Sequence, residues 1–278
     1  MTLKLWLAVA VLVYVAAAGV IFLFQRALLY FPDHLYLAPS EIKTVFPFRE
    51  LPVATEDGLA LTGWYAAAKS RPYTIVFFHG NGDSLRTIAF IANPYLAAGY
   101  GFFLAEYRGY SGMPGSPSET GLYADGRAFI EKLISSGIDA SKLIFMGYSL
   151  GTGVATQMAC EFNAAGLLLM APFLSVAKMA QIRFPVFPAS LLTLDRYENF
   201  RKVPDLRLPI LIAHGGRDGV IPQSQGRRLF ELANEPKQFY FAPLKDHTNI
   251  FDSDFIAFSL NWLETIGAQS SNSKRPAQ

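Results

Sequence analysis

The sequence predicts an α/β fold built on a mostly parallel, doubly wound sheet of eight strands. Short apolar runs alternate with amphipathic stretches from about residue 44 to 267, as expected for parallel strands joined by crossover helices. Glycine and polar residues directly follow several of these runs, where the chain would leave the carboxyl end of a strand. The chain has 278 residues, of which 51% are hydrophobic, and this suits one large domain with a sizeable core.

An uncharged apolar segment, Leu5–Phe24, lies near the start of the chain. Twenty helical residues span about 30 Å, which matches the hydrocarbon thickness of a bilayer. We therefore expect a transmembrane anchor over residues 1–26 and a single-pass membrane protein, with the side of the membrane on which the following domain lies left open. A cleaved signal peptide is the alternative, because Lys4 gives a basic start and Ala16–Ala18 resemble a cleavage site. The apolar run continues unbroken to Phe24, which favours the uncleaved anchor.

Residues 27–43 are expected to form a connector, and the domain is expected to occupy residues 44–267. Two early strands have no helix between them, which predicts an antiparallel start to the sheet. The polar residues 268–278 are expected to form a disordered tail. The strands are expected near 44–54, 59–66, 74–78, 102–105, 143–146, 167–170, 210–213 and 238–242, and the helices at 84–98, 119–135, 150–162, 223–233 and 251–263.

An insertion interrupts this alternation between the strand ending near Ala171 and the one starting near Ile210. It contains several prolines and is much longer than an ordinary crossover loop, so we expect a lid at about 174–207. A surface excursion without function is the alternative.

The strongest local signal is Gly147–Gly151, with the sequence GYSLG. It follows an apolar strand and leads into a helix, which is the context of a nucleophile elbow. A side chain at 147 or 151 is expected to collide with the neighbouring strand or helix. Glycine at both positions permits the tight turn that exposes the hydroxyl of Ser149, the candidate nucleophile.

Asp218 and His247 are the candidate partners of Ser149. His247 alone among four histidines lies beyond the last expected strand, where it could accept the serine proton at neutral pH. Asp218 follows the penultimate strand and would orient the imidazole and stabilise the imidazolium. A loop residue capping the next helix is the alternative for Asp218. His79 and His214 each precede a glycine at a strand end and are expected to support loop geometry.

The run HGNGD at 79–83 ends the third expected strand, whose loop supplies half of the oxyanion hole in this arrangement. The backbone N–H of Asn81 is the candidate donor, paired with the N–H of Leu150 directly after the nucleophile. A plain strand-to-helix turn is the alternative, since Asn and Gly are common in turns.

Taken together, these stretches resemble the α/β-hydrolase superfamily and, within it, the membrane-anchored Bem46-like group related to the ABHD-type hydrolases. Two departures are Glu106, where Asp is usual, and Gly219, where a larger residue is common after the acid. The resemblance implies an α/β-hydrolase fold and hydrolysis of an ester or thioester. It is carried by FFHGNG at 77–82, EYRGY at 106–110, GYSLG at 147–151, HGGRD at 214–218, DH at 246–247 and the N-terminal anchor.

The expected reaction is acyl transfer to water through an acyl-enzyme, without a metal or cofactor. An aromatic-rich lid near a bilayer favours a carboxylic ester of a small molecule or lipid, with Phe184 and Phe187 as the substrate-binding residues. A thioesterase or serine peptidase on the same residues is the alternative, and a non-catalytic membrane-anchored scaffold is the alternative from another class. The net charge of +2 gives no indication of a nucleic-acid partner, and the oligomeric state is left open.

Overall fold

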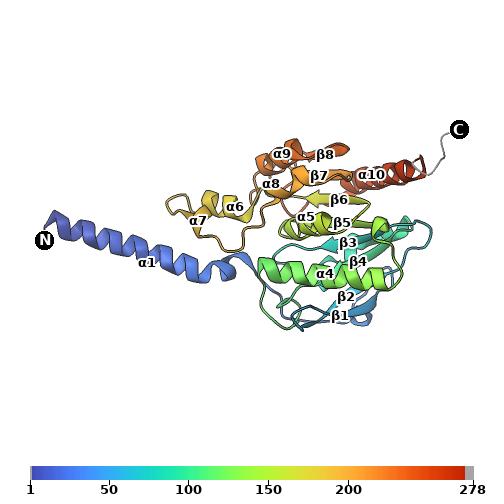
Figure 1. Ribbon diagram of the computed structural model, residues 1–278, viewed down its shortest axis with the longest axis horizontal. Coiled ribbons are helices and arrows are strands. Elements are labelled where there is room, and N and C mark those ends of the chain that lie inside the picture. The colour runs from blue at the N-terminus through green and yellow to red at the C-terminus, as the bar shows by residue number, and fades with distance from the viewer. Residues whose placement is uncertain (1, 273–278) are drawn as a thin grey trace.

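The computed structural model describes residues 2–272 and contains an eight-stranded sheet with helices on both faces (Figure 1). The spatial order of the strands is β1-β2-β4-β3-β5-β6-β7-β8. β2 pairs antiparallel with both β1 and β4, and all the later neighbours pair in parallel. The mostly parallel sheet of eight strands and its antiparallel start, both predicted from the sequence, are confirmed.

The strands are short and the helices vary widely in length. The strands are β1 (Arg49–Ala54), β2 (Ala60–Ala66), β3 (Thr74–Phe78), β4 (Gly101–Ala105), β5 (Leu143–Tyr148), β6 (Gly166–Met170), β7 (Ile210–Gly215) and β8 (Lys237–Ala242). The α-helices are α1 (Leu3–Leu29), α2 (Leu85–Ile88), α3 (Asn93–Ala97), α4 (Glu119–Ser135), α5 (Gly151–Glu161), α6 (Val176–Arg183), α7 (Ala189–Leu192), α8 (Asn199–Lys202), α9 (Gln223–Leu232) and α10 (Ser253–Asn272). Short 3-10 turns are η1 (Pro39–Glu41), η2 (Ala89–Ala92), η3 (Ala140–Lys142) and η4 (Val203–Asp205).

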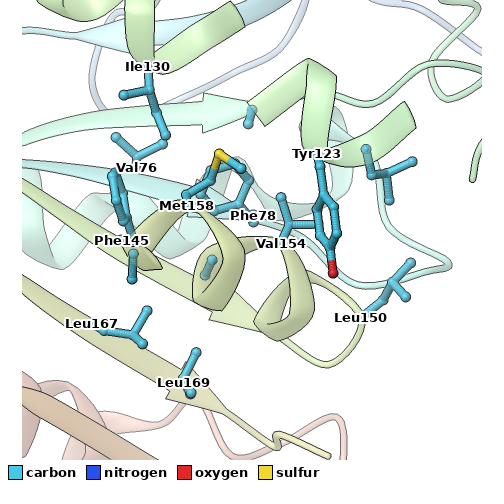
Figure 2. Close-up of a cluster of buried hydrophobic side chains, with 14 of the residues drawn as sticks. Val76, Phe78, Tyr123, Ile130, Phe145, Leu150, Val154, Met158, Leu167 and Leu169 are labelled. Atoms are coloured by element: carbon cyan, nitrogen blue, oxygen red, sulfur yellow. The ribbon is translucent and has the colours of Figure 1, made fainter. Parts of the chain in front are cut away.

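Two layers of apolar side chains bury the sheet. Successive residues of a strand point to opposite faces, so alternate residues enter different layers. Val76 and Phe78 of β3 pack with side chains of α4, α5 and α9, and Figure 2 shows this cluster around Met158. Ile75 and Phe77 pack with α2, α3 and α10 on the other face. The strands are apolar almost throughout because both faces are covered.

The N-terminal helix extends beyond its predicted end at residue 26. α1 continues to Leu29, so residues 27–29 are helical and do not belong to the expected connector. Arg26 does not interrupt the helix, because arginine is a good helix former, and its guanidinium pairs with Asp195 at 2.9 Å. The first strand also starts later than predicted, at Arg49 rather than near residue 44.

Two helical segments differ from the prediction. The helix expected at 84–98 is broken into α2, η2 and α3, and Pro94 lies in the first turn of α3, where proline is tolerated. α10 continues to Asn272, so residues 268–272 are helical rather than disordered. The remainder of the predicted tail, 273–278, lies outside the described residues.

The insertion between β6 and β7 contains α6, α7, α8 and η4. We refer to residues 174–207 as the lid. α6 and α7 lie alongside the carboxyl-terminal half of α1, which projects from the rest of the molecule (Figure 1). Two contacts fix this arrangement, a hydrogen bond from the Tyr14 hydroxyl to the Val186 carbonyl and the ion pair between Arg26 and Asp195.

Candidate active site

Ser149 lies in the turn between β5 and α5, at the carboxyl edge of the sheet. Its φ of 50° lies in the left-handed region, which residues with a side chain rarely adopt. The backbone N–H of Ser149 donates to the Met170 carbonyl at the end of β6, at 3.0 Å. The Thr152 hydroxyl donates to the Ser149 carbonyl at 2.6 Å. These two hydrogen bonds hold a strained turn that places the serine side chain above the sheet.

The glycines on either side of Ser149 are required by close packing. A Cβ at residue 147 would lie 2.5 Å from the carbonyl oxygen of Gly151. A Cβ at residue 151 would lie 2.0 Å from the carbonyl oxygen of Phe78, at the end of β3. The predicted collisions with the neighbouring helix and strand are therefore present, and the GxSxG spacing follows from packing.

Ser149, His247 and Asp218 meet at the carboxyl edge, although they come from three different strand ends. The Nε2 atom of His247 lies 3.0 Å from the Ser149 Oγ, and its Nδ1 lies 2.7 Å from the Asp218 Oδ2. In the neutral imidazole, Nδ1–H donates to the carboxylate and Nε2 accepts from the hydroxyl. The structure thus brings together the three side chains that sequence analysis selected.

Asp218 is held as a carboxylate. Its Oδ1 accepts the backbone N–H groups of Val220 and Ile221, at 2.9 and 2.8 Å. Burial opposes ionisation, but hydrogen bonds from His214, His247 and the Ile221 N–H outweigh it and hold the pKa of Asp218 well below its usual range. The His214 Nε2 also lies 2.9 Å from the Ile221 carbonyl oxygen. His214 therefore supports the loop that carries Asp218, as predicted.

Two hydrogen bonds fix the loop that carries His247, the candidate general base. The Tyr148 hydroxyl donates to the His247 carbonyl at 2.7 Å, so the residue before the serine positions the histidine backbone. The Arg217 N–H donates to the Lys245 carbonyl at 2.9 Å, which joins the Asp218 and His247 loops. A Cβ at Gly215 would lie 2.5 Å from that same carbonyl oxygen. Glycine at position 215 thus permits the backbones of the Asp218 loop and the His247 loop to approach each other closely.

The loop after β3 rests on a buried network around Glu106. Its Oε1 lies 2.7 Å from the His79 Nε2, and neither side chain is exposed to solvent. The Glu106 Oε2 accepts the Ser111 hydroxyl at 2.5 Å and the Leu85 N–H at 3.3 Å. Burial lowers the pKa of His79, but the Glu106 carboxylate outweighs burial and the pKa is raised. His79 therefore supports loop geometry, as predicted, and Glu106 is its partner.

Asn81 and Leu150 lie beside Ser149 on the wall of one cavity. Neither backbone N–H donates a hydrogen bond within the described part of the chain. The Asn81 carbonyl accepts from the Phe31 N–H and the Tyr110 hydroxyl, at 3.1 and 3.0 Å, which fixes the orientation of its peptide unit. Both N–H groups are therefore free to receive an oxygen of a substrate.

A cavity of about 530 Å³ leads to Ser149 and is lined mainly by apolar side chains. Phe184 and Phe187, selected from the sequence, are on its wall. Tyr197 and Phe200 of the lid are not. The His, Cys, Asp and Glu side chains of residues 2–272 form no group of three or more that could hold a metal ion.

One wall of the cavity was not predicted. It comes from α1, and Gln25 is the one polar residue in the apolar stretch before Arg26 that could have indicated contact with the lid. The Gln25 side chain bonds with the backbone of Leu192 and Leu194, at 3.3 and 2.8 Å. The residues of α1 on this wall are Ala18, Ile21, Phe22, Gln25, Leu28 and Leu29.

The sheet order and the placement of Ser149, Asp218 and His247 after β5, β7 and β8 define the class of an α/β hydrolase. The model of the alpha/beta hydrolase family matches residues 75–266. The chain belongs to this family, and membership supports hydrolase activity.

Curated relatives extend the similarity beyond the matched region. Uncharacterized protein Rv2307c of Mycobacterium tuberculosis is 34% identical over 87% of this chain and 87% of its own length. Alpha/beta hydrolase domain-containing protein 17B of Xenopus laevis is 31% identical over 65% of this chain and 62% of its own length. The predicted resemblance to ABHD-type hydrolases is confirmed.

Among solved structures, the Pyrococcus furiosus esterase Pf2001 superposes with a TM-score of 0.68 at 16% identity. The match covers 85% of this chain and 98% of the esterase chain. An alpha-beta hydrolase from Vibrio vulnificus matches 79% of this chain and 81% of its own, with a TM-score of 0.65 at 23% identity. Both likenesses support the fold.

Gly151→Ala is expected to destabilise the protein, because the new methyl group would overlap the Phe78 carbonyl on a rigid strand end. Overpacking of this kind costs about 1–3 kcal/mol or more in the free energy of unfolding. Chemical denaturation would measure the loss. Gly82→Ala is the matched control, because no heavy atom lies within 4 Å of its added Cβ. Equal stability of the two variants would contradict the packing argument.

Proposed function

We propose that the protein is a membrane-anchored serine hydrolase that cleaves a carboxylic ester of an apolar acyl group through an acyl-enzyme. The observation that carries this proposal is the chain of contacts from Ser149 through His247 to Asp218, at 3.0 and 2.7 Å, with Ser149 on the wall of an apolar cavity. A hydroxyl, an imidazole and a carboxylate in this order can activate a nucleophile at neutral pH.

Each step of the reaction has a group in place. The Ser149 Oγ attacks the ester carbonyl while the His247 Nε2 takes its proton, and Asp218 stabilises the imidazolium. The N–H groups of Asn81 and Leu150 bind the oxyanion of the tetrahedral intermediate. Its collapse breaks the C–O bond, and the alcohol leaves with the proton from His247. Water then attacks the acyl-enzyme by the same route and releases the acid and free Ser149.

We further propose that α1 remains attached as a membrane anchor. Over Leu3–Leu29 it is long and apolar enough to cross a membrane, and none of its residues is buried in the protein. A cleaved signal sequence passes the same test, but Tyr14 precedes the potential cleavage site and contacts the lid. Its ring stacks on Phe187 with 5.1 Å between centroids. Cleavage would remove this contact and leave apolar residues 20–24 at a free end in water.

Ser149→Ala is expected to abolish both labelling by a fluorophosphonate probe and hydrolysis of p-nitrophenyl esters, because only an activated hydroxyl reacts with the probe. By analogy with other triads, Asp218→Asn is expected to lower kcat by about 10⁴-fold. Asp254→Asn is the control, since Asp254 is exposed at the start of α10 and lies outside both the chain of contacts and the cavity wall. Undiminished labelling of Ser149→Ala would place the nucleophile elsewhere, and a folded wild type without labelling would favour a binding scaffold.

Phe184→Ala and Phe187→Ala are expected to lower kcat/KM more for long acyl esters than for short ones, since both side chains line the cavity. One buried methylene contributes about 0.8 kcal/mol, so loss of a few contacts gives a difference of about tenfold. p-Nitrophenyl esters of graded chain length provide the measurement. Phe200→Ala, in the lid but off the cavity wall, is the control. An equal loss at every chain length would indicate a stabilising role only.

Full-length protein is expected to keep its N-terminal segment and to resist extraction from membranes by carbonate, since burial of an apolar helix does not depend on charge. Intact mass and sedimentation after carbonate treatment would measure both properties. A mass corresponding to cleavage after Ala18, or release by salt alone, would contradict retention of the anchor.

A further inference from the structure

The Ser149 cavity extends along α1 into the part of that helix that would lie in the membrane. Ala18, Ile21, Gln25 and Leu28 line it at intervals of three or four residues, which places them on one side of the helix. From Ala18 to Leu28 the helix rises by about 15 Å. Ala18 and Ile21 fall within the uncharged segment long enough to span the hydrocarbon. The cavity therefore lies between α1, the lid and the loops at the carboxyl edge of the sheet, which include Asn81 and Ser149.

Large apolar side chains are exposed on the lid, and the exposed, charged Arg183 lies next to one of them in the chain. Ile182, Val186 and Leu191 are 53%, 71% and 80% exposed. The contact between Tyr14 and Val186 fixes the depth of this surface, because Tyr14 lies about 15 Å along the helix from Phe24. Contiguous exposed apolar side chains are unfavourable in water and favourable in lipid. Their place along α1 identifies the hydrocarbon of one leaflet as what covers them.

Side chains satisfy backbone polar groups where the lid helices break. The Gln181 Oε1 accepts the N–H of Ser190 at the start of α7, at 3.2 Å. After α7, the Gln25 side chain donates to the Leu192 carbonyl and accepts the Leu194 N–H. Hydrocarbon offers no water to such groups, so a lipid-immersed segment must satisfy them internally. Two glutamines and Tyr14 therefore satisfy some of the backbone groups that immersion would otherwise leave without a partner.

From these observations we propose that the α6–α7 end of the lid, around Val186 and Leu191, is immersed together with α1 in one leaflet, and that the cavity between them takes its acyl chain from that leaflet. The substrate is then a long-chain acyl ester of a lipid already dissolved in the bilayer, which reaches Ser149 without crossing water. This inference rests on the proposed esterase function and adds the source of the substrate.

The test uses Val186→Asp and Leu191→Asp, two exposed positions of the lid that do not line the cavity. Full-length protein in phosphatidylcholine vesicles is assayed on 4-methylumbelliferyl oleate dissolved in the vesicles and on p-nitrophenyl butyrate in water. A carboxylate in hydrocarbon is costly, so kcat/KM on the oleate should fall about tenfold or more. Activity on butyrate should stay within about twofold, as for ordinary surface substitutions.

Val45→Asp is the matched control. Val45 is 74% exposed and precedes Arg49, which pairs with Tyr65 at the sheet edge opposite to Ser149. It should leave both activities unchanged. The lid variants could turn over the oleate as fast as wild type while butyrate hydrolysis still depends on Ser149. That result would overturn entry from the leaflet but leave the proposed esterase function standing. Butyrate hydrolysis that survives Ser149→Ala would instead overturn the proposed function.

Immersion can also be measured without an activity assay, which keeps the proposal testable if the aspartate variants fold poorly. In a Cys160→Ser background, Val186→Cys and Val45→Cys can each carry an environment-sensitive fluorophore. Nitroxide-labelled lipid should quench the label at 186, and aqueous iodide should quench the label at 45. Quenching at 186 by iodide alone would overturn immersion. An S-oleoyl peptide in the same vesicles tests whether the oleoyl group is carried by a lipid or by a peptide. Turnover of that thioester without turnover of an oleoyl lipid ester would overturn the assignment to lipids.

Discussion

The geometry of the site depends on the close approach of α5 to the end of β3. At Gly151 the backbones meet so closely that a Cβ would lie 2.0 Å from the Phe78 carbonyl oxygen. This approach brings together Leu150 and the loop that carries Asn81, the two residues whose N–H groups we propose as oxyanion donors. Preorganised donors of this kind favour a developing oxyanion without a reorganisation cost. The two glycines of the elbow thus serve chemistry through packing, although neither has a side chain to contribute.

Buried ionic groups stabilise this edge of the sheet, and their cost in desolvation is offset by dense hydrogen bonding. Glu106 bonds with His79, Ser111 and the Leu85 N–H beneath the Asn81 loop. Asp218 is surrounded by donors in the same way. The glutamate at 106, a departure from the usual aspartate, therefore has a structural function. Its carboxylate connects the ends of β3 and β4 to the start of α2, which fixes the loop that carries Asn81.

The features that sequence predicted well are those fixed by local pattern and chain order. β3 and α4 match their predicted bounds, and Ser149, Asp218 and His247 were found because each follows a recognisable strand. The α1 wall of the cavity was missed because α1 is apolar on every side, so periodicity cannot show which side faces the protein. Its pairing with the lid joins residues 169 positions apart, Arg26 and Asp195, and no local pattern reports such a contact.

The Arg26–Asp195 pair orients α1 relative to the sheet domain. The Asp195 side chain is only 7% exposed, and its Oδ1 accepts the N–H of Glu119, the first residue of α4, at 3.0 Å. One carboxylate therefore joins the anchor, the lid and a core helix. Removing the guanidinium would leave that carboxylate buried and uncompensated, which is far more costly than losing a surface ion pair. The pair lies just beyond the apolar segment, so in the membrane-anchored arrangement that we propose its charges would avoid the hydrocarbon while fixing the carboxyl edge of the sheet toward the bilayer.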